Sequence, residues 1–267
     1  MKLAISNIAW EIHNDPRMFA QLSGNNISGI EIAPTKVWPC WEGANQKNAE
    51  IYKKQLADEG FQIPAMQAIL FGKPELQLFD KDTHAAFLEH MRLVSDIAAG
   101  LGAKVLVFGA PKNRKRGQLS TTDAVEIAIE FLEKVGEICH ASQCCLGLEH
   151  NPVEYGCDFI TNAADARQLV DSINHPGIQL HLDGAGLHMC DGNIGDVIKT
   201  VTPFVHYHIS EPMLEPIAGG VVDHTVAFRV LKKLNYSGWY SIEMKQPKTP
   251  KLVSESIAQV RSLFSSS

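Results

Sequence analysis

The sequence has no apolar run long enough to cross a bilayer, no paired-cysteine motif and no excess of positive charge. A membrane span needs about 20 consecutive apolar residues, so we expect no membrane contact. The 30 acidic residues outnumber the 24 lysines and arginines, and a net charge of −6 gives no general attraction for nucleic acid or anionic lipid. The segment Lys112–Arg116 is a basic cluster, which we interpret as a solvated loop that follows a strand.

The six cysteines also lack the spacing of a redox or zinc motif, because none belongs to a Cys-x-x-Cys pair. Cys144 and Cys145 are adjacent in an apolar run, so they would face opposite sides of a strand. We expect free thiols in a reducing compartment. Met1 is followed directly by a short apolar run and not by a long apolar leader, which predicts a cytoplasmic protein.

Eight short apolar runs recur along the chain, and few of them alternate with polar residues. This pattern is typical of parallel strands that are buried on both faces. The predicted strands are Lys2–Ser6, Gly29–Ala33, Gln62–Leu70, Lys104–Gly109, Cys145–Glu149, Ile178–Asp183, Val205–Ile209 and Gly238–Glu243.

Amphipathic stretches with a helical period separate several of these runs. The predicted helices include Phe87–Leu101, Asp123–Ser142, Ala163–Ile173 and Val226–Leu234, and Ser120, Thr121 and Thr122 are candidate N-caps for the second of them. Regular alternation of strand and helix predicts an α/β protein, a single (β/α)8 TIM barrel domain over residues 1–267. An open doubly wound sheet is the alternative, but the first strand is followed by Ser6–Trp10, which is not a glycine-rich phosphate loop.

Four consecutive predicted strands end in an acid or a histidine: Glu149, Asp183, His208 and Glu243. Charged groups at the ends of buried strands are costly unless they are paired or bind a metal. In a barrel these ends lie at one rim, so the four side chains are expected to converge on one divalent ion, Mn²⁺, Mg²⁺, Co²⁺ or Zn²⁺. The alternative is a ring of ion pairs with bases such as Lys245, but few cations lie at the matching strand ends.

The motifs Leu148–Pro152, His181–His188, His206–Glu211 and Asn235–Glu243 resemble those of the xylose isomerase-like superfamily, which includes sugar phosphate isomerases and epimerases and AP endonuclease family 2. The Gly29–Ile32 strand also fits, so the resemblance covers nearly the whole chain. It implies that Glu149, Asp183, His208 and Glu243 are the metal ligands.

His206 is the rival of His208, since residues two apart on a strand face the same way. His208 lies nearer the C-terminal end and fits the family's His-x-x-acid pattern, so we prefer it. We expect His206 and His181 to be hydrogen-bonded residues inside the barrel.

Further residues are candidates for contact with a substrate, and each is equally compatible with a structural role. They are Glu154 and His188 in the loops after the fifth and sixth strands, Lys245 after the eighth, Gln67 and Glu31 at the ends of the third and second, and Trp10, Trp38 and Trp41 as stacking surfaces for a sugar.

Two classes of function follow from the resemblance. The first is a metal-dependent isomerase or epimerase of a small sugar, polyol or keto acid. Glu149 and Glu243 would act as the acid and base that move a proton next to a metal-bound carbonyl. A dehydratase of the dehydroshikimate or inosose type is the close alternative, because the same site can expel a β-hydroxyl group. We expect a small carbohydrate-like substrate, and a homo-oligomer is compatible with the sequence.

The second class is an AP endonuclease, which would require histidines at the ends of the third and fourth strands. The corresponding runs, Ala65–Leu70 and Val105–Gly109, contain none. The sequence therefore predicts no nucleic-acid partner. A sugar-binding barrel without catalysis is a third possibility, against which the intact ligand set argues. The arginine that the ketose epimerase branch carries after its seventh strand is also missing from Glu211–Ile217, which argues against the epimerisation of free ketoses.

Overall fold

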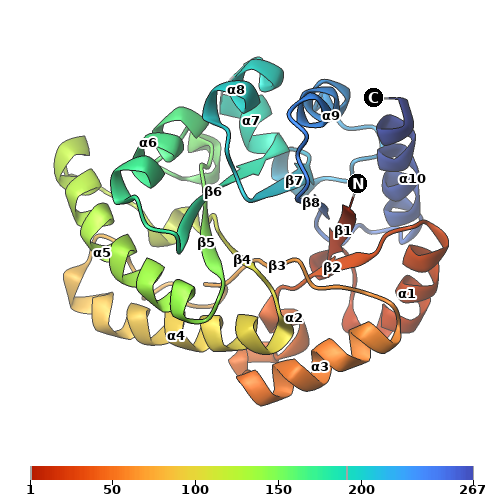
Figure 1. Cartoon of the computed structure of the whole chain (residues 1–267), viewed down its shortest axis with the longest axis horizontal. Helices are drawn as coiled ribbons and strands as arrows, with labels where there is room; N and C mark the ends of the chain where they lie inside the picture. The colour runs from red at the N-terminus through yellow and green to blue at the C-terminus, as the bar shows by residue number, and fades with distance from the viewer. Residues whose placement is uncertain (1, 191, 267) are drawn as a thin grey trace.

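The computed structural model describes residues 2–190 and 192–266, and Figure 1 shows the strands gathered at the centre with helices around them. The strands are β1 (Lys2–Ser6), β2 (Gly29–Glu31), β3 (Ala65–Met66), β4 (Val105–Phe108), β5 (Cys145–Glu149), β6 (Ile178–Asp183), β7 (His206–Ser210) and β8 (Trp239–Glu243). The helices are α1 (Asp15–Gly24), α2 (Pro34–Val37), α3 (Gln46–Asp58), α4 (His84–Leu101), α5 (Thr121–Ala141), α6 (Ala163–Ile173), α7 (Gly184–Cys190), α8 (Ile194–Val201), α9 (His224–Lys233) and α10 (Lys251–Ser266).

All neighbouring strands are parallel, in the order β2-β1-β8-β7-β6-β5-β4-β3. Two isolated bridges, Gly29 with Gln62 and Ile32 with Met66, join β2 to β3. The chain is therefore a nearly closed (β/α)8 barrel, as the sequence predicts, and the alternative of an open doubly wound sheet is wrong.

The third strand is much shorter than the predicted run Gln62–Leu70. Pro64 has no N–H group to give to the ladder. Ala68 has a φ of 53°, which turns the chain out of the extended conformation directly after Gln67. The apolar residues that follow are buried in a loop and not in a strand: Ile69 and Leu70 are 1% and 4% exposed.

The helices bury the faces that their periodicity indicates. In α4 the residues Phe87, Met91 and Val94 are at most 1% exposed, and each such side chain stabilises the fold by about 1.5–3 kcal/mol. The N-cap of α5 is Ser120, whose Oγ accepts a hydrogen bond from Asp123 N at 3.1 Å. None of the described helices is both long and apolar enough to traverse a bilayer.

The strand register sets which residues meet at the C-terminal rim. Asp183 on β6 is paired with His208 on β7, and Ser210 is paired with Glu243 on β8. Glu149, the last residue of β5, is paired with His181 on β6. The ends of β5 to β8 therefore lie side by side at one level of the barrel.

Candidate metal and active site

Three carboxylates surround one nitrogen of His208. Its Nδ1 lies 3.1 Å from Glu243 Oε2, 3.8 Å from Asp183 Oδ1 and 3.9 Å from Glu149 Oε1. The histidine is fully buried, while the three acid side chains are 10–12% exposed. The four residues singled out at the strand ends are thus brought to one point that solvent still reaches.

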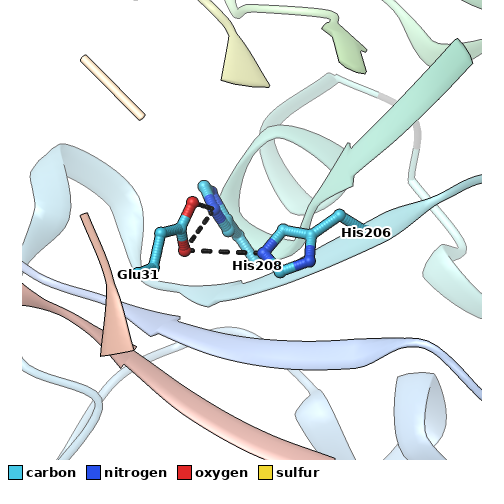
Figure 2. Close-up of side chains that lie close together, drawn as sticks. All are labelled: Glu31, His206 and His208. Atoms are coloured by element: carbon cyan, nitrogen blue, oxygen red, sulfur yellow. Dashed lines mark hydrogen bonds and ion pairs between the residues drawn. The ribbon is translucent and has the colours of Figure 1, made fainter. Parts of the chain in front are cut away.

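The other nitrogen of His208 faces a carboxylate from β2, three strands away in the barrel. Glu31, at the end of β2, is fully buried, and its two oxygens lie 3.0 and 3.1 Å from His208 Nε2 (Figure 2). His206, the first residue of β7, has its Nε2 3.5 Å from Glu31 Oε2 (Figure 2). Glu31 therefore orients His208, and His206 is a buried partner of Glu31, as expected for an interior residue.

Asp183 is held by donors from its own loop and from β7. Ser210 Oγ donates to Asp183 Oδ1, and Gly186 N donates to Oδ2 at 2.8 Å. Ser210 in turn accepts a hydrogen bond from Ala185 N at 2.9 Å. These bonds fix the orientation of the carboxylate at the start of α7.

Glu149 lies in a space that a glycine leaves open. A Cβ atom on Gly109, the residue after β4, would lie 2.2 Å from Glu149 Oε2. Asn151 Nδ2 donates to the same oxygen at 3.1 Å, and His181 Nε2 lies 3.3 Å from Oε1. The carboxylate is thus confined between β4, its own loop and β6.

The charges in this cluster perturb one another strongly. Burial, followed by the charges of Asp183 and Glu243, raises the pKa of Glu149 to about 8. Burial and Glu243 raise the pKa of Asp183 to about 6. Burial opposes a positive charge on His208, yet Glu31 and Glu243 raise its pKa well above the usual value. Without a cation among them, Glu149 and Asp183 therefore hold protons at a higher pH than ordinary carboxyl groups.

The donor set suits a divalent ion. Nδ1 of His208 is buried and has no hydrogen-bond partner among the described residues, although three acids surround it. Asp183, His208 and Glu243 form one group whose ligand atoms all lie within 4.8 Å of one another, and Glu149, His181 and His208 form another. Carboxylate oxygens with one imidazole match the preference of Mg²⁺, Mn²⁺ or Zn²⁺.

Two cavities open onto these carboxylates. One, of about 440 Å³, lies between the loops that follow β3 and β4, and the other, of about 310 Å³, lies beside the loops that follow β5 and β7. Glu149 and Glu243 line both cavities, as does Pro111. A small substrate in either cavity would therefore have both glutamates on the wall beside it.

The remaining candidates have different positions. Gln67 lines the larger cavity and donates a hydrogen bond to Ser6 Oγ. Trp10 is 4% exposed, donates to Asp15 at 2.7 Å and lines a separate small pocket. Glu154 and His188 are exposed and line neither cavity. Lys245 is at the surface, where it pairs with Glu215. Only Gln67 of these five thus lines a cavity at the carboxylates.

Tyr155 is a residue of the site that the sequence analysis did not single out. It ends the short 3-10 turn Val153–Tyr155, and its hydroxyl accepts a hydrogen bond from Met213 N at 2.9 Å. Both residues line the smaller cavity, so this bond ties the loop after β5 to the loop after β7 beside the carboxylates. An aromatic residue next to the candidate Glu154 was the available signal in the sequence.

The fold and the cluster define the chain as a (β/α)8 barrel with a carboxylate and imidazole centre at the C-terminal rim, the usual location of barrel active sites. The model of the xylose isomerase-like TIM barrel family matches residues 19–263. The chain belongs to this family.

Solved structures with low sequence identity share the fold. The crystal structure of D-psicose 3-epimerase with D-tagatose from Clostridium cellulolyticum H10 is 13% identical, with a TM-score of 0.81 and coverage of 99% of both chains. The structure of the IolI protein with a bound zinc atom is 17% identical, with a TM-score of 0.72 and coverage of 98% of this chain and 96% of that chain.

A curated relative matches a shorter part of the sequence. A putative hydroxypyruvate isomerase from Danio rerio is 27% identical over 90 residues, which is 33% of each protein. The match thus spans a third of the relative's length.

Proposed function

We propose that this protein is a divalent-metal-dependent isomerase or epimerase that moves a proton next to the carbonyl group of a small sugar, polyol or keto acid. The observation that carries the proposal is the position of Glu149 and Glu243. They approach His208 from β5 and β8, on either side of β6 and β7, and both line both cavities. Sugar epimerases among the structures with the same fold, and the hydroxypyruvate isomerase relative, support this class of reaction.

Asp183, His208, Glu149 and Glu243 would hold the ion. When bound there, a divalent ion supplies Lewis-acid stabilisation of the negative charge that develops on a carbonyl oxygen. Ser210 and Gly186 keep Asp183 in place, and Glu31 does the same for His208.

Glu149 and Glu243 would divide the proton transfer between them. One carboxylate takes the proton from the carbon next to the carbonyl, and the other returns a proton to the neighbouring carbon, or to the opposite face of the same carbon. The first outcome is an isomerisation and the second an epimerisation. Asn151, which donates to Glu149, orients the carboxylate for this transfer.

The test is solvent exchange in D₂O with the protein loaded with Mn²⁺ and small α-hydroxyketones as substrates. Solvent deuterium is expected at the reacting carbon, detected by NMR, and turnover should fall at least 100-fold in Glu149→Gln and in Glu243→Gln. The matched control is Glu133→Gln, an exposed glutamate of α5 that lines neither cavity, which should keep wild-type exchange. Unchanged exchange in both glutamine variants would remove these residues from the mechanism, and a conjugated product formed with loss of water would indicate a dehydratase.

A further inference from the structure

The larger cavity contains positive as well as negative side chains. Glu149 and Glu243 line it together with Lys73, from the loop after β3, and Lys112, from the loop after β4. Metal binding and proton transfer, as proposed above, make no use of either lysine. They form the part of the site that the proposed reaction does not yet explain.

Neither ammonium group has a close carboxylate partner among the described residues. Lys73 Nζ lies 3.9 Å from Glu75 Oε1, and the two side chains are 34% and 61% exposed, so this pair is worth little. Lys112 is exposed and forms no ion pair within 4.0 Å with another described residue. Both charges are therefore available to a ligand.

The two lysines are held on one rigid framework. Asn113, which follows Lys112, donates from Nδ2 to Lys73 O and to Leu76 O, both at 2.7 Å. Its carbonyl accepts a hydrogen bond from Leu78 N at 2.8 Å. Because the side chain of Asn113 is buried, these bonds fix the loop after β4 against the loop after β3, with both lysines on the wall of the cavity.

A third cation of these loops is buried close enough to Glu149 to act on its charge. Arg114 is fully buried, and all three of its guanidinium nitrogens are without a hydrogen-bond partner among the described residues. A buried guanidinium with no bonded anion is costly. Its charge acts on Glu149, and its guanidinium lies 5.9 Å from the ring of Phe108. The segment interpreted from the sequence as a solvated basic loop thus contributes Lys112 to the cavity and buries Arg114 in the interior.

An anionic substrate needs such cations, because the floor of the site is acidic. A negative group near Glu149, Asp183 and Glu243 is repelled unless positive charge offsets it. Lysine and arginine side chains are the usual partners of carboxylate and phosphate groups.

We propose that the larger cavity selects α-hydroxycarbonyl substrates that carry a carboxylate or phosphate group, and that Lys112 and Lys73 bind this group. The inference rests on the proposed function, since it assumes that the carbonyl end of the substrate lies at the carboxylates. It assigns the anionic end to the loops after β3 and β4. The buried charge of Arg114, which acts on Glu149, adds to the positive potential of the site.

The experiment compares the binding of matched probes to the protein loaded with Mn²⁺. Dihydroxyacetone, dihydroxyacetone phosphate and hydroxypyruvate share the HOCH₂–CO group and differ only at the other end, and D-fructose with D-fructose 6-phosphate repeats the comparison for a longer chain. At least one anionic probe is expected to bind with a Kd at least tenfold lower than its neutral counterpart. The ratio of the neutral probe's Kd to the anionic probe's Kd should decrease as the salt concentration rises from 0.05 to 0.5 M, because salt screens exposed charges.

Variants locate the source of the preference. Lys112→Gln should reduce the ratio severalfold, and the double variant Lys73→Gln/Lys112→Gln should bring it near one while the Kd of the neutral probe stays unchanged. Lys115→Gln is the matched control, an exposed lysine of the same segment that does not line the cavity, and it should keep the wild-type ratio.

Equal Kd values for neutral and anionic probes in the wild type would overturn the inference, as would a preference that persists in the double variant. The phosphate and carboxylate arms show which anion is preferred. The binding ratio is independent of turnover, so a protein that binds anionic probes but exchanges no deuterium would contradict the proposed function and leave the anion selectivity supported.

Discussion

Glu31 and His208 are 177 residues apart in sequence, yet both carboxylate oxygens of Glu31 lie within 3.1 Å of Nε2 of His208. A histidine that donates its Nε2 proton to a carboxylate presents the lone pair of Nδ1 on its other side. That side faces Asp183, Glu149 and Glu243. The pairing therefore decides which nitrogen is available to a cation.

Glu31→Gln should weaken metal binding without removing the ligands. The amide keeps the shape of the side chain but no longer carries the charge that orients the imidazole, so we expect a loss of about 10- to 100-fold in affinity. Competition with a fluorescent chelator measures the change. Glu215→Gln, at the surface beside Lys245, is the control. Wild-type affinity in a folded Glu31→Gln protein would show that Glu31 serves only to fill the interior.

Asp183→Ala should lose the metal. Asp183 supplies one of the three carboxylates around Nδ1, and the others cannot replace its oxygen without moving. Elemental analysis of the purified variant is expected to give well under half of the wild-type stoichiometry. His188→Ala, on the helix that follows Asp183 but exposed, should retain the metal in full. Equal metal content in the two variants would count against the assignment.

Gly109→Ala should weaken metal binding and deuterium exchange, although Gly109 itself contributes no side chain to the site. The new methyl group would lie 2.2 Å from Glu149 Oε2, so the carboxylate has to move. We expect at least a tenfold loss of metal affinity and of deuterium exchange. Gly24→Ala, where the added atom meets nothing within 4 Å, should change neither property. A Gly109→Ala protein with wild-type metal affinity would mean that Glu149 is not needed at its present position.

The metal-free protein should become less stable as the pH rises from 6.5 to 8. The pKa of Glu149 is about 8 in the folded protein against an ordinary 4.5, so in this window the folded state holds a proton that the unfolded chain has released. The contribution of Glu149 to stability then falls with pH, by at most about 1.4 kcal/mol for each pH unit. Each kcal/mol of lost stability lowers the Tm by about 2–4 °C.

Glu149→Gln cannot titrate, so its metal-free Tm should fall less steeply over the same window. Scanning calorimetry of both proteins in EDTA tests this difference. Parallel pH profiles for the two proteins would show that Glu149 does not carry the extra proton.

The sequence predicts the fold and the convergence of the strand ends for one physical reason. Parallel strands of a barrel end at one rim, and the period of two fixes which face a side chain takes. Both properties hold for the four residues at the ends of β5 to β8, which are Glu149, Asp183, His208 and Glu243. They also hold for Gln67, which lies one residue beyond β3 and lines the larger cavity.

The direction of a side chain in a loop cannot be predicted in this way, because hydrogen bonds and ion pairs with distant residues set it. Lys245 turns to Glu215, and Trp10 donates to Asp15, so neither faces the carboxylates. Conversely, Lys73 and Lys112 line the cavity because Asn113 joins their two loops. Its side chain donates a hydrogen bond to Lys73 O, 40 residues away in the sequence. No period in the sequence predicts such a bond.

We expect the sparse pairing between β2 and β3 to couple closure of the barrel to occupation of the site. Two isolated bridges, with four backbone hydrogen bonds, are the only β-pairing between these described strands, and Glu31, the partner of His208, is on β2. Amide hydrogens exchange with solvent through local openings wherever pairing is sparse. The amides of Ile32 and Gln67, which bond across this seam, should therefore be among the first of the described strand ends to exchange, and bound metal should slow them more than the amides of β7. Part of the free energy of metal binding would then stabilise the pairing of β2 with β3, which closes the barrel.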